Sequence, residues 1–149
     1  MRRRATASWA ALALGAVLAL SGCGSAPELT ARDGYVPQPV MADMAGGFLT
    51  VVNTGDTADR LTRVTSDISD DVELHRTQDG TMRQVRSLEV PAGGELVLSR
   101  GADHIMFKEL RRTPVEGEKV TVTLHFAESD PLEVTLPVKA TTYRPAAGR

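Results

Sequence analysis

The chain has 149 residues, of which 42% are hydrophobic and 24% are charged, a composition typical of one globular domain. Its 17 basic and 19 acidic residues give a formal charge of −2. A mildly acidic chain without basic runs argues against nucleic-acid binding. The length also excludes a large multidomain enzyme.

The N-terminal residues have the pattern of an export signal. Three arginines precede an apolar run from Trp9 to Leu20, shorter than the roughly 20 residues that a membrane-spanning helix needs. The run ends in a Leu-Ser-Gly-Cys sequence that resembles the lipobox of bacterial lipoproteins. We therefore predict a signal peptide over residues 1–22, acylation of Cys23, and attachment to the extracytoplasmic face of the bacterial plasma membrane.

The single cysteine of the chain limits the chemistry of the domain. If Cys23 carries lipid, no thiol is left for a disulfide, a thiolate zinc site, a cysteine nucleophile or a blue-copper centre. The sequence also lacks a Gly-x-Ser-x-Gly elbow, a His-Glu-x-x-His motif and a glycine-rich phosphate loop. We therefore do not expect an enzyme.

Proline, glycine and polar residues are frequent near both ends of the mature chain. This composition is typical of segments without regular structure. We predict a lipidated cysteine and flexible tether over residues 23–40, one domain over residues 41–139, and a disordered C-terminal tail over residues 140–149.

Between these ends the sequence predicts only β-strands. Short apolar or alternating runs are separated by turn residues, among them Asn53-Thr-Gly-Asp56 and Asp79-Gly80. The expected strands cover residues 48–52, 61–65, 72–75, 81–85, 95–98, 104–107, 120–126 and 132–136. About seven to eight strands at roughly ten-residue spacing favour an all-β Greek-key sandwich or open barrel.

Histidine and methionine side chains on these strands form a candidate metal site. His104 and Met106 share one strand face, because residues i and i+2 point to the same side about 7 Å apart. If the hairpin at Asp79-Gly80 has a two-residue loop, His75 lies opposite Gln84 and diagonal to Met82 on the same face. Two His–Met pairs that face each other would form a site of two imidazoles and two thioethers.

The proposed ligands indicate which metal the site would prefer. Thioether sulfur is soft and neutral, so a set of two His and two Met favours Cu(I) over zinc, calcium or magnesium. Such ligands also remain usable in an oxidising compartment, where thiols are lost to disulfides.

Other residues of the same types have simpler interpretations. A methionine in a strand is usually core packing. His125 lies on the strand face away from its apolar neighbours and has no methionine two residues away, so we do not expect it to be a ligand. Met41 and Met44 lie near the predicted start of the domain, where packing or the tether explains them better than a role as extra soft ligands.

Residues 45–138 resemble the PCu(A)C family of periplasmic copper chaperones. The resemblance rests on Asn53-Thr-Gly, Asp59-Arg-Leu, Val72-Glu-Leu-His75, Val90-Pro-Ala-Gly-Gly, Gly101-x-x-His104-Ile-Met106 and Pro114-x-x-Gly117. As in the metal motif of that family, 21 residues separate Met82 from His104, and one separates His104 from Met106. The first interval is shorter than in the family: six residues separate His75 from Met82, and Arg76 occupies the place where many members carry Met.

The resemblance implies a cupredoxin-like β-sandwich that binds Cu(I) through His75, Met82, His104 and Met106. It further implies delivery of copper to the copper centres of cytochrome c oxidase, often alongside a thiol-bearing Sco-type chaperone. Two alternatives remain open, namely a copper scavenging or resistance protein and a metal-free β-sandwich interaction module. Copper titration separates the last alternative from the other two, and a transfer assay separates delivery from scavenging.

Overall fold

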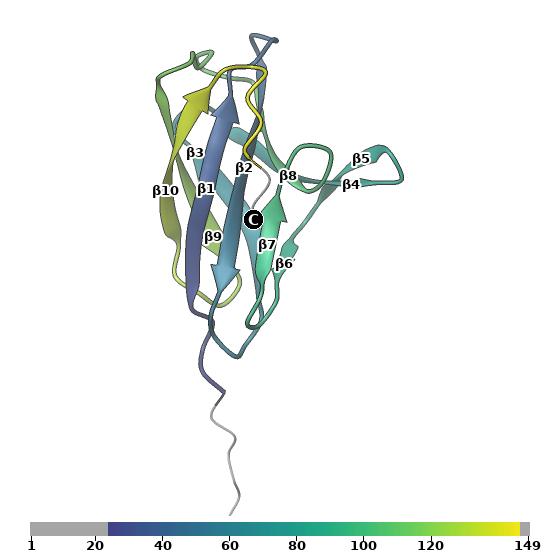
Figure 1. Cartoon of the computed structure of the whole chain (residues 1–149), viewed down its shortest axis with the longest axis vertical. Helices are drawn as coiled ribbons and strands as arrows, with labels where there is room; N and C mark the ends of the chain where they lie inside the picture. Colours follow the sequence, from purple (N-terminus) through teal and green to yellow (C-terminus); the bar gives the residue numbers. More distant parts are fainter. Residues whose placement is uncertain (1–23, 147–149) are drawn as a thin grey trace, which may run out of the picture.

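The computed structural model describes residues 24–146, which form ten β-strands and contain no helix (Figure 1). The strands are β1 (Leu29–Pro37), β2 (Met44–Asn53), β3 (Asp59–Ser66), β4 (Asp71–Gln78), β5 (Thr81–Val85), β6 (Leu88–Val90), β7 (Glu95–Leu98), β8 (His104–Lys108), β9 (Lys119–Phe126) and β10 (Leu132–Lys139). None of these residues 24–146 belongs to a helix that could cross a membrane. The predicted signal peptide, Cys23 and residues 147–149 lie outside the described residues.

The strands form one open sheet that folds into two layers. The strand order is β5-β4-β8-β2-β1-β10-β9-β3-β6, and β7 pairs with β2 beside this path. In Figure 1, β1, β2 and β7 lie in front of β9 and β3. β1 connects the layers, because it pairs antiparallel with β2 and parallel with β10. The prediction of an all-β sandwich or open barrel is confirmed, with ten strands in place of seven or eight.

Strand β1 occupies a segment that the sequence analysis assigned to the tether, so that boundary was wrong. Its first residues alternate between half-buried and exposed positions and carry polar side chains, which hides the strand in the sequence. A register shift between Arg32 and Tyr35, with Asp33 at a φ of 57°, interrupts the alternation. After this bulge, Tyr35 and Val36 are buried in the core.

The C-terminal residues up to 146 pack on the domain, which corrects the expectation of a disordered tail for that part. The Tyr143 ring contacts the Tyr35 ring edge-on at a centroid distance of 5.0 Å. Thr141 donates a hydrogen bond from its hydroxyl to the Gln38 carbonyl at 2.8 Å, and its own carbonyl accepts one from Arg100. The tail residues thereby cover part of the front layer.

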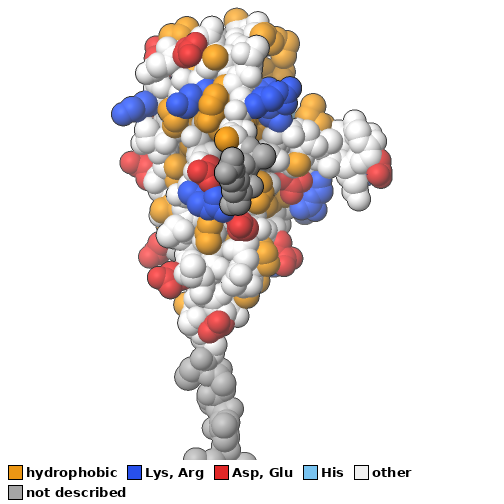
Figure 2. Space-filling view, in the orientation of Figure 1, with side chains coloured by type: hydrophobic (Ala, Val, Ile, Leu, Met, Phe, Trp, Pro, Cys, Tyr) orange, Lys and Arg blue, Asp and Glu red, His pale blue; other side chains and the backbone are white. Residues whose placement is uncertain are grey.

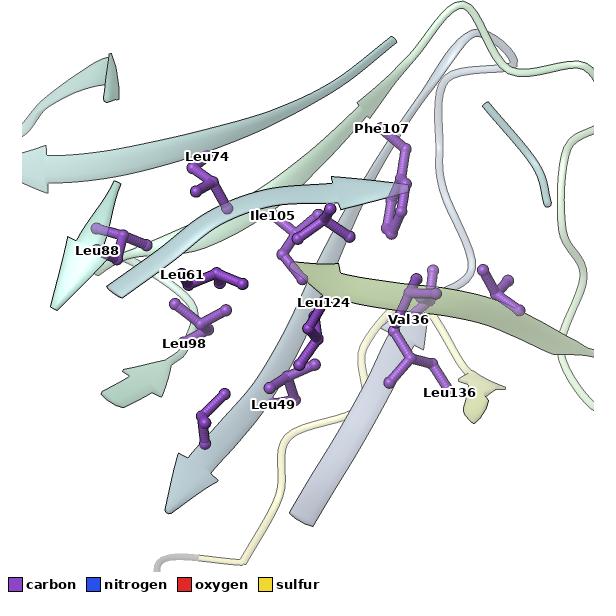
Figure 3. Packing of buried hydrophobic residues seen from close by; sticks show 14 of the residues in the cluster. Val36, Leu49, Leu61, Leu74, Leu88, Leu98, Ile105, Phe107, Leu124 and Leu136 are labelled. Atoms are coloured by element: carbon purple, nitrogen blue, oxygen red, sulfur yellow. The ribbon is translucent and has the colours of Figure 1, made fainter. Parts of the chain in front are cut away.

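The hydrophobic core lies between the two layers (Figure 3). Figure 3 labels Val36, Leu49, Leu61, Leu74, Leu88, Leu98, Ile105, Phe107, Leu124 and Leu136. Burial of each such side chain stabilises the fold by about 1.5–3 kcal/mol. In β8, Ile105 and Phe107 are fully buried, so His104 and Met106 must point to the opposite face of that strand.

The surface carries charges of both signs. Basic and acidic side chains are interspersed over the face drawn in Figure 2. An electrostatic field of one sign therefore does not build up on this face.

Candidate metal centre

The histidine pair lies on two neighbouring strands, β4 and β8, near one end of the sheet, where β5 is the edge strand. β4 and β8 pair antiparallel, with His75 directly opposite His104. The two ring centroids are 5.4 Å apart. Directly opposite residues in an antiparallel pair share one face, so both imidazoles lie on the side away from the core.

The β4–β5 hairpin has the register that the sequence predicted. His75 pairs with Gln84, and Thr77 pairs with Met82. Asp79 and Gly80 have φ values of 52° and 74°, as a two-residue type I′ loop requires. Met82 is therefore the diagonal neighbour of His75 on the same face.

The hydrogen bonds of His104 determine which of its nitrogens can bind a metal. His104 is buried, and its Nδ1 lies 2.8 Å from the Ala102 carbonyl oxygen. A carbonyl only accepts, so Nδ1 carries the proton and donates it. The neutral ring then has its lone pair at Nε2.

His75 has the opposite tautomer. Its Nε2 lies 2.7 Å from Oε2 of Glu73, so Nε2 donates to the carboxylate. Its Nδ1 is buried and finds no hydrogen-bond partner among residues 24–146. Native proteins rarely leave a buried polar atom unpaired, so this nitrogen is a strong candidate for a metal ligand.

Glu73 holds His75 in place and balances the charge beside the pair. Its carboxylate accepts hydrogen bonds from His75 and from the Lys108 ammonium, which is 3.0 Å away. These two hydrogen bonds hold the pKa of Glu73 below its usual range, and the one from His75 has the larger effect. The same contact with Glu73, together with Asp71 at 3.3 Å, raises the pKa of Lys108. Carboxylate–histidine pairs of this kind fix the tautomer of a metal-binding imidazole.

The two predicted methionine ligands occupy different surroundings. Met106 lies opposite Glu73 on one side and Gly46 on the other. Met82 is 57% exposed on the β4–β5 hairpin, which projects from the body of the domain (Figure 1). The structure thus brings His75, His104 and Met106 together, with Met82 one diagonal step farther out.

His125 lies on β9, in the other part of the sheet, where both ring nitrogens have partners. Its Nε2 lies 3.1 Å from the Thr65 hydroxyl, and its Nδ1 lies 3.4 Å from the Arg63 guanidinium. Burial, and secondarily the positive charge of Arg63, lower the pKa of His125. His125 therefore lies apart from the histidine pair, on a different strand.

Sequence reasoning missed the residues that support the histidine pair. Glu73 could have been found from its i, i+2 spacing to His75, which places both on one strand face. Arg76 points to the other face and forms a double hydrogen bond with Asp103, both contacts at 3.2 Å. This ion pair, which raises the pKa of Arg76, joins the hairpin to the loop before His104.

No group of three His, Cys, Asp or Glu within residues 24–146 could hold a metal ion. In the predicted donor set, the thioethers of Met82 and Met106 accompany the two imidazoles on the same face of the sheet. A set of two imidazoles and two thioethers would suit a soft ion better than a hard ion such as calcium or magnesium.

Comparison with known proteins agrees with this architecture. Residues 29–138 match the family described as "Putative lipoprotein LpqE-like". The chain belongs to this LpqE-like family. A curated relative, "Putative lipoprotein Lxx21020" of Leifsonia xyli subsp. xyli (strain CTCB07), is 35% identical over 101 residues. That alignment covers 64% of this chain and 61% of the relative, so the LpqE-like chain spans about three fifths of that protein.

Solved structures similar to the LpqE-like protein are PCuAC domains and a copper protein. The apo PmoF2 PCuAC domain has a TM-score of 0.70 at 19% identity and covers 83% of this chain and 99% of its own. The copper-bound PmoF2 domain scores 0.67 at 19% identity, covering 78% and 97%. CuI-DR1885 from Deinococcus radiodurans scores 0.67 at 26% identity, covering 82% and 85%. The predicted resemblance to PCu(A)C proteins and the cupredoxin-like fold are confirmed.

Proposed function

We propose that this LpqE-like protein is a Cu(I) chaperone tethered to the outer face of the plasma membrane. The observation that carries the proposal is the histidine pair. With His75 Nε2 donating to Glu73 and His104 Nδ1 donating to Ala102, the neutral rings keep their lone pairs at His75 Nδ1 and His104 Nε2. The similarity to CuI-DR1885 supports copper in the Cu(I) state. The name of the family supports the lipid anchor at Cys23.

The proposed ligand set is His75, Met82, His104 and Met106. All four ligands are neutral when they bind metal. Because Cu(I) carries only one positive charge, the ligand set can hold it without an anionic ligand. The unpartnered Nδ1 of His75 would gain a bond on metal binding. The proposed ligands lie on β4, β5 and β8 near one end of the sheet, and Met82 is on the projecting hairpin. This position keeps the ion near the surface, where another protein can reach it.

Delivery then needs only ligand exchange. Cu(I) leaves the imidazoles and thioethers as ligands of the recipient bind it, and no electron moves. We propose the copper centre of a cytochrome c oxidase subunit, or the thiols of a Sco-type chaperone, as the recipient. The lipid on Cys23 would hold the chaperone near such membrane partners.

Competition with a Cu(I)-specific chelator tests the proposal on the full chain in detergent. We expect one Cu(I) per chain at the histidine pair, with zinc bound far more weakly. Met82→Leu should weaken binding by about threefold to tenfold, which corresponds to roughly 0.6–1.4 kcal/mol. A chain that binds no Cu(I), or binds zinc equally well, would refute the proposal.

Two further experiments test delivery and the anchor. Copper-loaded protein should transfer Cu(I) to an isolated oxidase copper-binding domain, whereas a scavenging protein would retain it. Cys23→Ala should release the protein from membranes or block its maturation. A Cys23→Ala variant that stays membrane-bound and is processed normally would contradict the lipoprotein assignment.

A further inference from the structure

Three methionines lie together next to the histidine pair. Met41 and Met44 pair across a two-residue turn through an isolated antiparallel bridge. Met44 lies opposite Lys108 on β8, while Met106 lies two residues away, opposite Gly46. Opposite and diagonal residues of an antiparallel pair share one face. The three thioethers therefore form a continuous group on the face that carries His104.

These side chains line one cavity of about 210 Å³. Gly46 keeps the cavity open next to Met106, since it places no side chain there. A Cβ at Gly46 would lie 3.3 Å from Cζ of Phe48, which is tight. Phe48, Val40 and Arg100 are among the other lining residues.

Packing does not account for the three methionines. Met41 is 51% exposed, and Val40 before it is 85% exposed. Met44 and Met106 are only partly buried. A methionine that fills a core is buried, whereas these three side chains line a cavity open to solvent.

We propose that Met41, Met44 and Met106 form a second Cu(I) position, made of thioethers alone, beside the histidine pair. This inference rests on the proposed function, because it assumes that copper is the cargo. Thioether ligands select Cu(I). The positive charge of Arg100, which lines the cavity, repels a divalent ion twice as strongly as a monovalent one.

Met106 belongs to both positions, since it shares a strand face with His104 and also lines the cavity. Copper can then pass between the positions while Met106 stays bound. The bonds from Met41 and Met44 break as those from His75 Nδ1 and His104 Nε2 form. The oxidation state and the proton count do not change. The exposed thioether position would be the place where copper enters or leaves.

The test removes the histidine ligands and asks what remains. The full chain in detergent carries His75→Gln and His104→Gln, since glutamine keeps a hydrogen-bond donor and its amide oxygen is a poor Cu(I) ligand. We expect residual Cu(I) binding, weaker than in the wild type, with only sulfur neighbours in X-ray absorption. Met41→Leu and Met44→Leu in this background should weaken that binding at least tenfold. Val97 is as exposed as Met41, at 51%, and lies outside the cavity, so Val97→Ala is the matched control and should leave that binding unchanged.

The outcomes separate this inference from the proposed function. If the wild type binds Cu(I) but the glutamine variant does not, the thioether position is refuted and the chaperone proposal stands. Equal effects of Val97→Ala and the Met41/Met44 double change would also refute it. If the wild type binds no Cu(I), both proposals fall. Thermal unfolding verifies that each variant folds, and a His104→Gln single background repeats the comparison with less change to the fold.

Discussion

The histidines in two parts of the sheet use their ring nitrogens differently. His125 on β9 has partners at both nitrogens, namely Thr65 and Arg63. His75 and His104 each have one nitrogen engaged, and the other carries a lone pair on the shared face of β4 and β8. All three rings are at least partly buried. The free nitrogen, more than burial, therefore distinguishes a candidate ligand from a structural histidine.

The two regions also differ in how carboxylates are used. Near His125, the buried Asp59 accepts four hydrogen bonds from Arg60, Glu128 and Ser129 and holds the β9–β10 loop on β3. Near the histidine pair, Glu73 accepts a hydrogen bond from Nε2 of His75, and Nδ1 of that ring has no partner among residues 24–146. The first carboxylate stabilises the fold, and the second orients the ring of a candidate ligand.

The largest effect on copper is expected from the histidine pair itself. His75→Ala and His104→Ala should each lower Cu(I) affinity by about 100-fold, roughly 2.7 kcal/mol. Removal of a residue that only orients a metal ligand lowers metal affinity about tenfold or more. Removal of the ligand itself should lower the affinity further. Chelator competition measures the affinity, and circular dichroism checks the fold. Unchanged affinity in both variants would remove the chaperone assignment.

Asp59 should affect stability and leave copper unchanged. Asp59→Ala leaves the Ser129 and Glu128 amides without their acceptor, which should lower the free energy of unfolding by about 2–3 kcal/mol. Burial by itself raises the pKa of Asp59. The hydrogen bonds outweigh this effect and lower the pKa overall, and the bond from the Ser129 hydroxyl contributes most.

The sign of the pH effect at Asp59 follows from that shift. The stabilisation is present above the unfolded pKa of about 3.8 and is lost as the pH falls below it toward the folded value. Urea unfolding at pH 7 and in acid measures both effects. An Asp59→Ala variant with wild-type stability, or with weakened copper binding, would contradict a purely structural role for Asp59.

Glu73 should affect copper binding less than the ligands do. Glu73→Gln retains an acceptor for His75 Nε2 but loses the charge that strengthens the bond, so Cu(I) affinity should fall about tenfold. Asp71→Asn is the matched control. Asp71 also contacts Lys108, but it lies at the opposite end of the β4–β8 pairing from His75. If both variants bind copper equally, Glu73 does not position the ligand.

Local patterns made much of the fold predictable. β5 and β7 were predicted with their observed bounds, and the hairpin register followed from Asp79-Gly80. β1 and β6 were missed for physical reasons. The bulge after Arg32 breaks the alternation in β1, and β6 has only three residues, too few for a pattern. Both strands depend on neighbours distant in sequence, which local reasoning does not supply.

The candidate site was predictable to a similar extent. Strand parity placed His104 and Met106 on one face, and the hairpin placed Met82 diagonal to His75. The pairing of β4 with β8, which brings the histidines face to face, joins segments about 30 residues apart and needed the tertiary structure. The position of Met41 and Met44 beside Met106 likewise depends on the pairing of β2 with β8.

The smallest effect on copper is expected at His125. His125→Ala should change Cu(I) affinity by less than about twofold, because the ring lies on β9 with both nitrogens engaged. Loss of the hydrogen bond to Thr65 should lower the free energy of unfolding by about 0.5–1.5 kcal/mol.

The pKa of His125 is lowered, first by burial and then by Arg63, so this residue makes the stability of the fold depend on pH. The wild type should lose stability as the pH falls below the unfolded value of 6.5, since the unfolded chain takes up the proton first. The variant should lack that part of the slope, which urea unfolding between pH 5 and pH 8 measures. Copper binding that depends on His125 would instead place a ligand in the wrong part of the sheet and break the contrast between the histidines.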